Sequence, residues 1–198
     1  MALDRITDAT VEPLTVEQAK RHLREDLDDP YVNDDIAAMI TTARMDAEHR
    51  LQRTLITTTW RLTLDAFPDF CTGHKDGAIR LPMGRTLSVA SVKYVDAAGT
   101  LQTLASDQYL VDTSGDTARI TPAYGLSWPS MRVQTGAVQV QYTAGYGSTA
   151  ASVPAPIASW IKLALTDLYG QRGRSSDRPM VPHQFADGLL GGDKIWSL

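Results

Sequence analysis

The chain has 198 residues, 43% of them hydrophobic, and a formal net charge of −4. This composition excludes global disorder, a membrane-spanning helix, which needs about 20 consecutive apolar residues, and the strongly basic character of a dedicated nucleic-acid-binding protein. The charge is uneven: residues 1–54 carry 7 basic and 12 acidic side chains, residues 55–150 carry 7 of each, and residues 151–198 carry 5 basic and 4 acidic. The acidity therefore lies at the front of the chain.

Residues 1–54 are predicted to be the N-terminal helical part of a core. Thr15 and Gln18 have the spacing of a capping box, which predicts a helix from residue 16 to about residue 26. A second helix is predicted over about residues 33–53, because apolar side chains recur there at spacings of three and four. This apolar stripe consists of Ile36, Ile40, Ala43, Ala47 and Leu51.

Residues 55–150 change period and are predicted to form a β-rich insertion. Trp60, Leu62 and Leu64 alternate with polar residues, as on a half-buried strand. Turn signals such as Asp96 to Gly99 separate further short runs of β-forming residues. These runs are residues 79–81, 89–95, 101–104, 109–112, 118–121 and 137–143. Short strands that follow one another without intervening helices favour an antiparallel sheet over βαβ units.

Residues 151–173 are predicted to contain the C-terminal core helix. Pro154 and Pro156 fit its first turn, where a missing N–H costs little, and Gly170 ends it. Its apolar face consists of Ile157, Trp160, Ile161, Ala164, Leu165 and Leu168. The predicted fold class is therefore α+β: two N-terminal helices and one C-terminal helix form a core, which an antiparallel β-rich insertion interrupts and an extended tail follows.

Residues 174–198 are predicted to be a linker and a tail. Glycine, arginine, serine and proline dominate residues 170–182, a composition that is typical of an extended linker. The tail then carries large apolar residues, namely Phe185, Leu189, Leu190, Ile195, Trp196 and Leu198. Three glycines, at positions 188, 191 and 192, argue against a stable autonomous helix. Exposed apolar side chains of this kind must be covered either by the chain's own core or by another protein, and aromatic anchors on a tethered tail are typical of an interface.

No constellation of catalytic residues is evident in the sequence. A phosphate-binding P-loop, a dinucleotide-binding glycine motif and a nucleophile elbow are all absent. The four histidines are dispersed, and the single cysteine, Cys71, excludes a disulfide framework and a multi-cysteine zinc site. We therefore predict no enzymatic activity, no cofactor and no metal.

Two charged clusters are candidate partner-binding sites. The acidic one consists of Glu25, Asp26, Asp28, Asp29, Asp34 and Asp35, and its spacing does not fit a calcium loop. It is either a solvated connection between two helices or an acidic face that meets a basic partner or a neighbouring subunit. The basic one consists of Arg172, Arg174 and Arg178. It is either part of a solvated linker or a contact for nucleic acid or an acidic protein surface.

An ordered set of short motifs spans almost the whole chain. The set consists of LTVEQAKRHLR at 14–24, DDPYVNDD at 28–35, HRLQRTLITTTW at 49–60, LTLDAFP at 62–68, IRLP at 79–82, SVKYVDAAGTLQTL at 91–104, ARITP at 118–122, SWP at 127–129, VQYTAGYG at 140–147, VPAPI at 153–157 and a Trp-containing apolar end. In this order the motifs resemble those of the head–tail connector family, the head-completion adaptors of tailed bacteriophages and gene transfer agents.

The resemblance implies a helical core interrupted by a β-rich insertion. It also implies a homo-oligomeric ring, expected to be a dodecamer, between the portal protein and the stopper and tail proteins. The C-terminal segment would reach into the portal, and DNA would pass through the lumen without sequence-specific binding. The expected location is the neck of a virion or phage-like particle that is assembled in the bacterial cytoplasm, with no membrane contact.

Two alternatives remain at this point: another neck ring protein, such as a tail terminator, or a small-molecule enzyme with an α+β fold. Two hypotheses follow from the connector resemblance. The acidity of residues 1–54 suits a lumen that repels DNA and lets it slide. Removal of residues 184–198 is predicted to leave a folded protein that no longer binds the portal.

Overall fold

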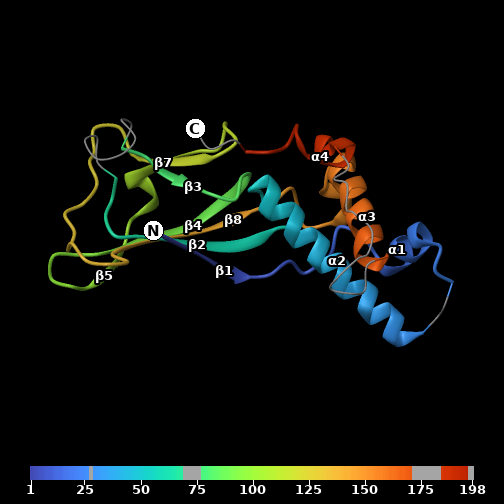
Figure 1. Cartoon of the computed structure of the whole chain (residues 1–198). Helices are drawn as coiled ribbons and strands as arrows, with labels where there is room; N and C mark the ends of the chain where they lie inside the picture. Colours follow the sequence, from blue (N-terminus) through green and yellow to red (C-terminus); the bar gives the residue numbers. More distant parts are fainter. Residues whose placement is uncertain (27–28, 69–76, 171–183, 196–198) are drawn as a thin grey trace. The chain divides into compact units, whose positions relative to one another are not determined.

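The computed structural model describes residues 1–26, 29–68, 77–170 and 184–195, and the chain divides into two compact units (Figure 1). Residues 1–9 and 57–145 form the β unit, and residues 10–56 and 146–198 form the helical unit. The helices are α1 (Val16–Leu23), α2 (Pro30–Leu51), α3 (Ala155–Gly170) and α4 (Gln184–Leu190). The strands are β1 (Ala2–Thr7), β2 (Thr58–Leu64), β3 (Ile79–Leu81), β4 (Thr86–Val95), β5 (Leu101–Thr103), β6 (Tyr109–Asp112), β7 (Ala118–Pro122) and β8 (Val138–Ala144), and 3₁₀ turns η1 and η2 lie at Ser106–Gln108 and Ala150–Ser152.

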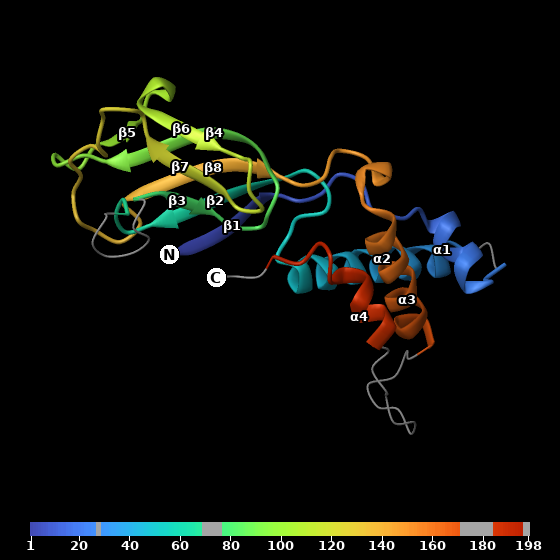
Figure 2. The same ribbon diagram turned by 90° about the horizontal axis from the view of Figure 1, so that it is seen from above.

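The β unit consists of two antiparallel sheets. Five strands are ordered β1-β2-β8-β4-β5, and three strands are ordered β3-β7-β6. The sheets lie one over the other in Figure 2, and buried side chains from both form a single apolar core. The predicted antiparallel strands are confirmed, but they form two packed sheets where the sequence predicted one.

Alternation of side chains builds this core. On β8, Val138, Val140 and Tyr142 are buried, whereas the residues between them are half-buried on the other face. β2 alternates in the same way and pairs with β8, with Leu62 opposite Val140. Burial of one such aliphatic or aromatic side chain stabilises the folded state by about 1.5–3 kcal/mol, so the period of two determines which face of the sheet is covered.

The N-terminal helices begin at side-chain caps. The Gln18 backbone N–H donates to Thr15 Oγ1 over 3.2 Å and the Thr15 N–H donates to Gln18 Oε1, which confirms the predicted capping box. α2 begins at Pro30, earlier than predicted, after Asp29 accepts a hydrogen bond from the Tyr31 N–H over 2.9 Å. Pro30 stands in the first turn of α2, where proline is favoured because its missing N–H has no partner to lose.

The helical unit buries the apolar stripe that the sequence predicts. The five stripe residues of α2, from Ile36 to Leu51, are at most 1% exposed. α2 packs against α3, which contributes Ile157, Trp160 and Leu165 to the same core. The local period of α2 and α3 was therefore a sufficient guide to their packing.

Residues 2–7 differ from the prediction, which assigned the whole of residues 1–54 to the helical part of the core. They form β1, an edge strand that pairs with β2, with Leu3 opposite Leu62. An edge strand is hydrogen-bonded on one side only and is half exposed. Its sequence therefore shows little apolar–polar alternation, and its strand conformation depends on pairing with a partner that is distant in sequence, here β2. The β unit is consequently discontinuous in sequence, since residues 1–9 join residues 57–145.

The C-terminal tail also contains more regular structure than predicted. Residues Gln184–Leu190 form α4 despite Gly188, and α4 packs against α3 and α2 within the helical unit. Leu190 is 5% exposed. One glycine inside a helix costs about 1 kcal/mol, which is less than the free energy gained when a leucine side chain is buried. α4 can therefore form against α3 and α2 even if it would not be stable as an isolated helix.

Candidate interaction site on the helical unit

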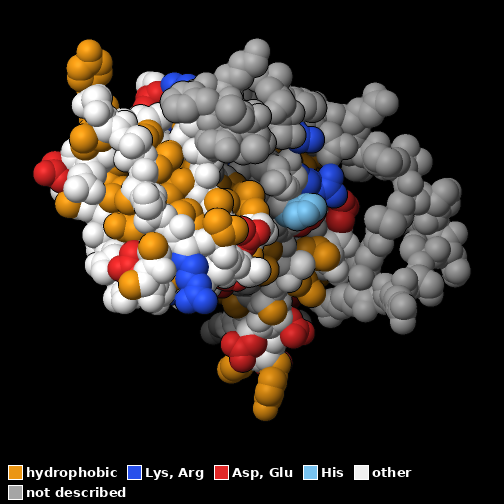
Figure 3. Space-filling view, turned by 90° about the vertical axis from the view of Figure 1, so that its left-hand side faces the viewer, with side chains coloured by type: hydrophobic (Ala, Val, Ile, Leu, Met, Phe, Trp, Pro, Cys, Tyr) orange, Lys and Arg blue, Asp and Glu red, His pale blue; other side chains and the backbone are white. Residues whose placement is uncertain are grey.

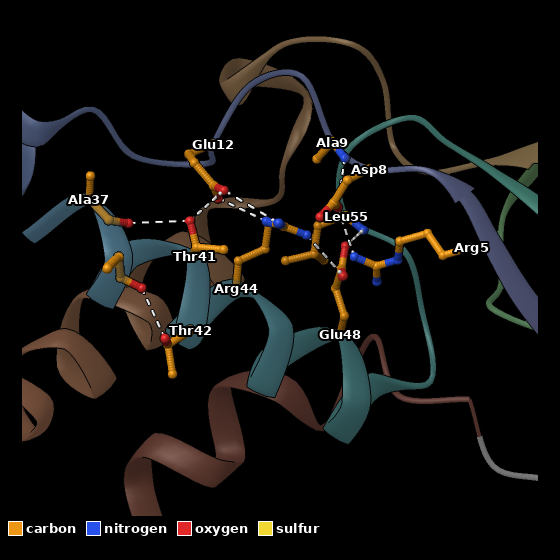
Figure 4. A network of polar contacts seen from close by, with 11 residues as sticks. Arg5, Asp8, Ala9, Glu12, Ala37, Thr41, Thr42, Arg44, Glu48 and Leu55 are labelled. Atoms are coloured by element: carbon orange, nitrogen blue, oxygen red, sulfur yellow. Dashed lines mark hydrogen bonds and ion pairs between the residues drawn. The ribbon is translucent and has the colours of Figure 1, made fainter. Parts of the chain in front are cut away.

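An arginine lies buried in the helical unit and is held by two carboxylates. Arg44, on α2, is 1% exposed; its Nε donates to Glu12 Oε2 over 2.8 Å, and its Nη1 donates to Glu48 Oε2 over 3.2 Å (Figure 4). Glu48 lies one turn further along the same helix and is equally buried. Because a buried charge is strongly destabilising without a partner, these three residues act as one group.

This Arg44 cluster ties two chain segments to α2. Glu48 Oε1 accepts a hydrogen bond from the Leu55 backbone N–H over 2.9 Å, after the end of the helix. The Thr41 hydroxyl donates to Glu12 Oε1 over 2.9 Å, before the start of α1. This cluster was not predicted from the sequence. The sequence contains an Arg–Glu pair four residues apart beside the apolar stripe, but such pairs are more common on solvent-exposed helix faces.

The C-terminal segment, residues 184–195, is anchored on the helical unit by polar contacts as well as by the packing of α4. Arg53 Nε donates to the carbonyl oxygen of Asp193. The Tyr146 hydroxyl donates to Asp193 Oδ1 over 3.0 Å, and the Ile195 N–H donates to the Leu51 carbonyl oxygen over 3.1 Å. A seat of side chains and backbone at the end of α2 therefore binds residues 193–195.

This seat is built where the chain passes from the helical unit to the β unit. The division between the units falls after Ile56 and after Gly145. On the helical side, the Tyr146 N–H donates to the Leu55 carbonyl oxygen over 3.0 Å, and Ile56 forms a parallel β-bridge with Gly147. Gly145 and Gly147 thus lie where the backbone passes from one unit to the other.

The structure describes only some of the tail residues that were predicted to bind a partner. Leu190 packs within the chain's own helical unit, and Leu189 and Ile195 are half-buried. Phe185 lies in α4. Five of the predicted partner-binding residues lie outside the described part: Arg172, Arg174, Arg178, Trp196 and Leu198. The apolar tail was expected to be covered either by the chain's own core or by another protein. α4 and residues 193–195 pack on the chain's own helical unit, and a role of the tail in partner binding stays a prediction.

The predicted acidic cluster is divided between structural and exposed residues. Glu25 accepts a hydrogen bond from the Tyr169 hydroxyl, and Asp29 caps α2. Asp26, Asp34 and Asp35 are exposed, and Asp28 lies outside the described residues. The exposed carboxylates, and not the cluster as a whole, are therefore available to a partner.

Perturbed ionisable groups of the β unit support turns and the core. Hydrogen bonds from the Ser114 hydroxyl and N–H, followed by the Arg119 guanidinium, lower the pKa of the Asp112 carboxyl. The Gln102 side-chain amide and the Thr100 N–H lower the pKa of Asp96 in the β4–β5 turn. Burial raises the pKa of the Tyr142 hydroxyl, which donates to the Pro82 carbonyl oxygen over 2.9 Å.

Exposed apolar side chains provide a further surface. In Figure 3, which views the left-hand side of Figure 1, hydrophobic side chains gather over much of the face shown. The loop between β7 and β8 exposes Tyr124, Leu126 and Val133, while Trp128 of the same loop stacks on Phe67 with ring centroids 4.6 Å apart. Exposed apolar area of this kind is typical of a protein that associates with others.

Two types of site were sought in the described residues without result. No group of three or more histidine, cysteine, aspartate or glutamate side chains in this part of the chain is placed to hold a metal ion. Among the same residues, no helix has both the length and the hydrophobicity to cross a membrane. Cys71 and His74 lie outside the described residues.

No family model matches the sequence, and no curated protein matches it either. Solved structures do match. The chain is similar to a chain of the neck of an empty gene transfer agent (GTA) particle computed with C6 symmetry (22% identity, TM-score 0.79), to a chain of the virion of a native GTA particle (23%, 0.81), and to a chain of the neck of a native GTA particle computed with C12 symmetry (22%, 0.70). Each match covers 100% of this chain and 97% of the other. The resemblance inferred from the ordered motifs is confirmed at the level of fold: this chain has the fold of a protein chain found in gene transfer agent necks.

Proposed function

We propose that this protein is a structural adaptor of a phage-like particle neck. It forms a ring between the portal and the stopper or tail and surrounds the DNA channel. The observation that carries this proposal is the likeness of fold to GTA neck chains, because it extends over 100% of this chain and 97% of theirs. The match therefore includes both the β unit and the helical unit, which is more specific than a single shared domain.

A ring requires each copy to present two different, complementary surfaces, because head-to-tail contacts close only by rotation. Two separate units, one with a sandwich of sheets and one with helices, supply such surfaces. The similar neck structures, computed with C6 and C12 symmetry, support an oligomeric ring, for which we propose twelve copies. The protein acts without catalysis, assembles in the bacterial cytoplasm and resides in the particle neck.

The C-terminal segment is proposed to bind the portal with the residues that follow its seat. The contacts of Asp193 and Ile195 with Arg53, Tyr146 and Leu51 hold residues 193–195 on the helical unit, next to the last three residues of the sequence. Trp196 and Leu198 then act as apolar anchors, and Arg172, Arg174 and Arg178 act as a basic contact. Leu190 serves the fold of the helical unit, because it is buried there.

Binding to purified portal tests this proposal. We expect the full chain to form a complex whose mass, measured by mass photometry, corresponds to a portal carrying a ring of about twelve added copies. The portal is present in every measurement because a ring can require a template. Binding to tail tube but not to portal would contradict the adaptor role and favour the tail-terminator alternative.

A short truncation tests the role of the tail. Removal of residues 196–198 keeps α4 and the seat of residues 193–195, whereas removal of residues 184–198 also takes Leu190 out of the core. We expect the short truncation to melt at the temperature of the full chain and to bind portal at least about tenfold more weakly, as for loss of an aromatic anchor. Unchanged portal affinity would show that the tail end is not a portal contact.

A further inference from the structure

The outer face of the five-stranded sheet is polar throughout its centre. The inner face carries Trp60, Leu62 and Val140 into the core. The intervening residues point to the other face and are half-buried or exposed. The central three strands place nine polar side chains on this outer face: Thr59, Arg61, Thr63, Ser88, Ser91, Lys93, Gln139, Gln141 and Thr143.

A hollow lies in the middle of this face. It is lined by Arg61, Ser91, Lys93, Gln139 and Gln141. The cross-strand register explains the grouping, because Arg61 on β2 is opposite Gln141 on β8, which is opposite Ser91 on β4, and Lys93 is opposite Gln139. Arg61 and Lys93 thus stand two strands apart, about 10 Å in the hydrogen-bonding direction, with the two glutamine amides of β8 between their strands.

Every side chain of the hollow can donate hydrogen bonds. A guanidinium offers five N–H groups, an ammonium three and each glutamine amide two. Within the described part of the chain, neither the Arg61 nor the Lys93 side chain takes part in a hydrogen bond or an ion pair. Asp4 is opposite Arg61 on β1 but is exposed and makes no ion pair with it. A half-buried, donor-rich surface with two cations fits carboxylates, which accept bidentate, charge-assisted hydrogen bonds.

Unpaired carboxylates are present on the helical unit of the same chain. Asp34 and Asp35 are adjacent and exposed near the start of α2, and Asp26 is exposed at the end of the preceding connection. The other carboxylates of this region are occupied, Glu25 by Tyr169 and Asp29 by the helix cap. Charge complementarity therefore exists between one unit and the other.

We propose that the Arg61–Lys93 hollow of one copy binds the Asp34 and Asp35 carboxylates of a neighbouring copy. This contact rests on the proposed ring and specifies how its copies join: the β unit of one copy meets the helical unit of the next. Such a contact is head-to-tail and closes into a ring. It also assigns Asp34 and Asp35 to a subunit interface, in place of the DNA-facing lumen inferred from the acidity of residues 1–54.

Nucleic acid is a less suitable occupant of the hollow. Tight binding of duplex DNA depends on the neutralisation of several phosphates. This face presents two cations beside Asp4, in a chain with a net charge of −4. Two cations match two carboxylates of a protein surface better than a long row of phosphates.

Paired charge reversals test the contact. One variant carries Arg61→Glu and Lys93→Glu, and the other carries Asp34→Lys and Asp35→Lys. With portal present, we expect each variant alone to form rings at least about tenfold less than the natural chain, because like charges would face each other at every interface. An equimolar mixture should recover the rings, since in an alternating ring every hollow then meets a region of opposite charge.

Matched controls keep the result interpretable. Arg132→Glu and Asp167→Lys reverse exposed charges outside the hollow and outside α2, and they should assemble normally. Circular dichroism melts of each variant check folding. The neutral pairs Arg61→Gln with Lys93→Gln and Asp34→Asn with Asp35→Asn provide milder variants, for which we expect a smaller loss of rings.

Each outcome decides for or against the contact. Rings that form in the mixture but from neither reversed variant alone support it. Normal rings from either reversed variant alone overturn it, and so does recovery in a chain that carries all four changes but not in the mixture, because the contact would then lie within one copy. Normal assembly of the Arg61–Lys93 variant with loss of duplex DNA binding would identify a nucleic-acid surface instead. If the natural chain forms no ring on portal, the proposed function itself is wrong. This outcome is distinct from failure of the contact, in which the natural chain still forms rings.

Discussion

The two units bury different kinds of side chain. The core of the β unit is formed by apolar side chains, and the polar side chains buried there among the described residues, Thr58, Thr86 and Tyr142, carry no charge. The helical unit instead encloses Arg44 with Glu12 and Glu48. An apolar core tolerates substitutions roughly in proportion to the volume lost, whereas a buried ionic group fails when one member is removed. The comparison indicates that the helical unit uses charge to hold particular chain segments in place.

Loss of Arg44 is expected to have the largest effect. Arg44→Leu leaves Glu48 buried without its cation, and we expect a loss of about 3–5 kcal/mol in the free energy of unfolding. Urea denaturation followed by circular dichroism measures this. Glu48→Gln is the matched control, because its side-chain oxygen still accepts from the Leu55 N–H, so a smaller loss is expected. A loss below about 1 kcal/mol for Arg44→Leu would mean that the cluster behaves as an exposed ion pair.

A cavity in the β unit gives the contrasting case. Leu62 is fully buried between β1 and β8 neighbours, and Leu62→Ala should reduce the free energy of unfolding by about 3 kcal/mol through lost burial and the cavity left behind. Leu62→Met preserves volume and should cost less than about 1.5 kcal/mol. If the two substitutions destabilised the protein equally, the β unit would not depend on apolar volume as described.

Alkaline pH should affect the β unit through Tyr142. Burial raises the pKa of this hydroxyl above its ordinary value of 10.0, so above about pH 10 the unfolded chain releases a proton that the folded chain keeps. Stability is therefore fully present below that pH and falls by about 1.4 kcal/mol per pH unit above it. Chemical denaturation between pH 9 and pH 11 measures the slope. Tyr142→Phe should flatten it, and an unchanged slope would refute this assignment.

The seat of residues 193–195 should show the smallest effect. Tyr146→Phe removes one hydrogen bond to Asp193, worth about 1 kcal/mol. We expect amide hydrogen exchange at Ile195 to accelerate about fivefold, as for a local opening of that free energy, with little change in global stability. Tyr169→Phe, which removes the contact with Glu25 at another place in the same unit, is the control. Equal exchange at Ile195 in both variants would indicate that Tyr146 does not anchor the segment.

The helices and strands whose apolar residues recur at a regular spacing could be predicted from the sequence. The α2 stripe from Ile36 to Leu51 and the alternation of Trp60 with Leu62 were visible because neighbouring residues alone define them. The pairing of β1 with β2 was not visible, because Leu3 and Leu62 are far apart in sequence. For the same reason, the sequence indicated no special role for Arg61 and Lys93, which only the register across β8 brings to one hollow.

The functional residues divide along the same line. The sequence placed Asp34 and Asp35 in one acidic cluster with Glu25 and Asp29. Only the hydrogen-bond partners in the structure distinguish the exposed Asp34 and Asp35 from Glu25 and Asp29, which stabilise the fold. The buried pair of Arg44 and Glu48 looked like a surface pair at i and i+4. The seat of residues 193–195 combines side chains and backbone groups of segments that are distant in sequence, and no residue type marks such a seat.

Electron cryomicroscopy of the full chain bound to portal would show directly whether this protein is the adaptor. We expect a closed ring coaxial with the portal, with the residues after Ile195 directed into portal density and with neighbouring copies joined head to tail around an open channel. Portal particles without added density, or density at the tail tube alone, would contradict the assignment of this chain as the adaptor.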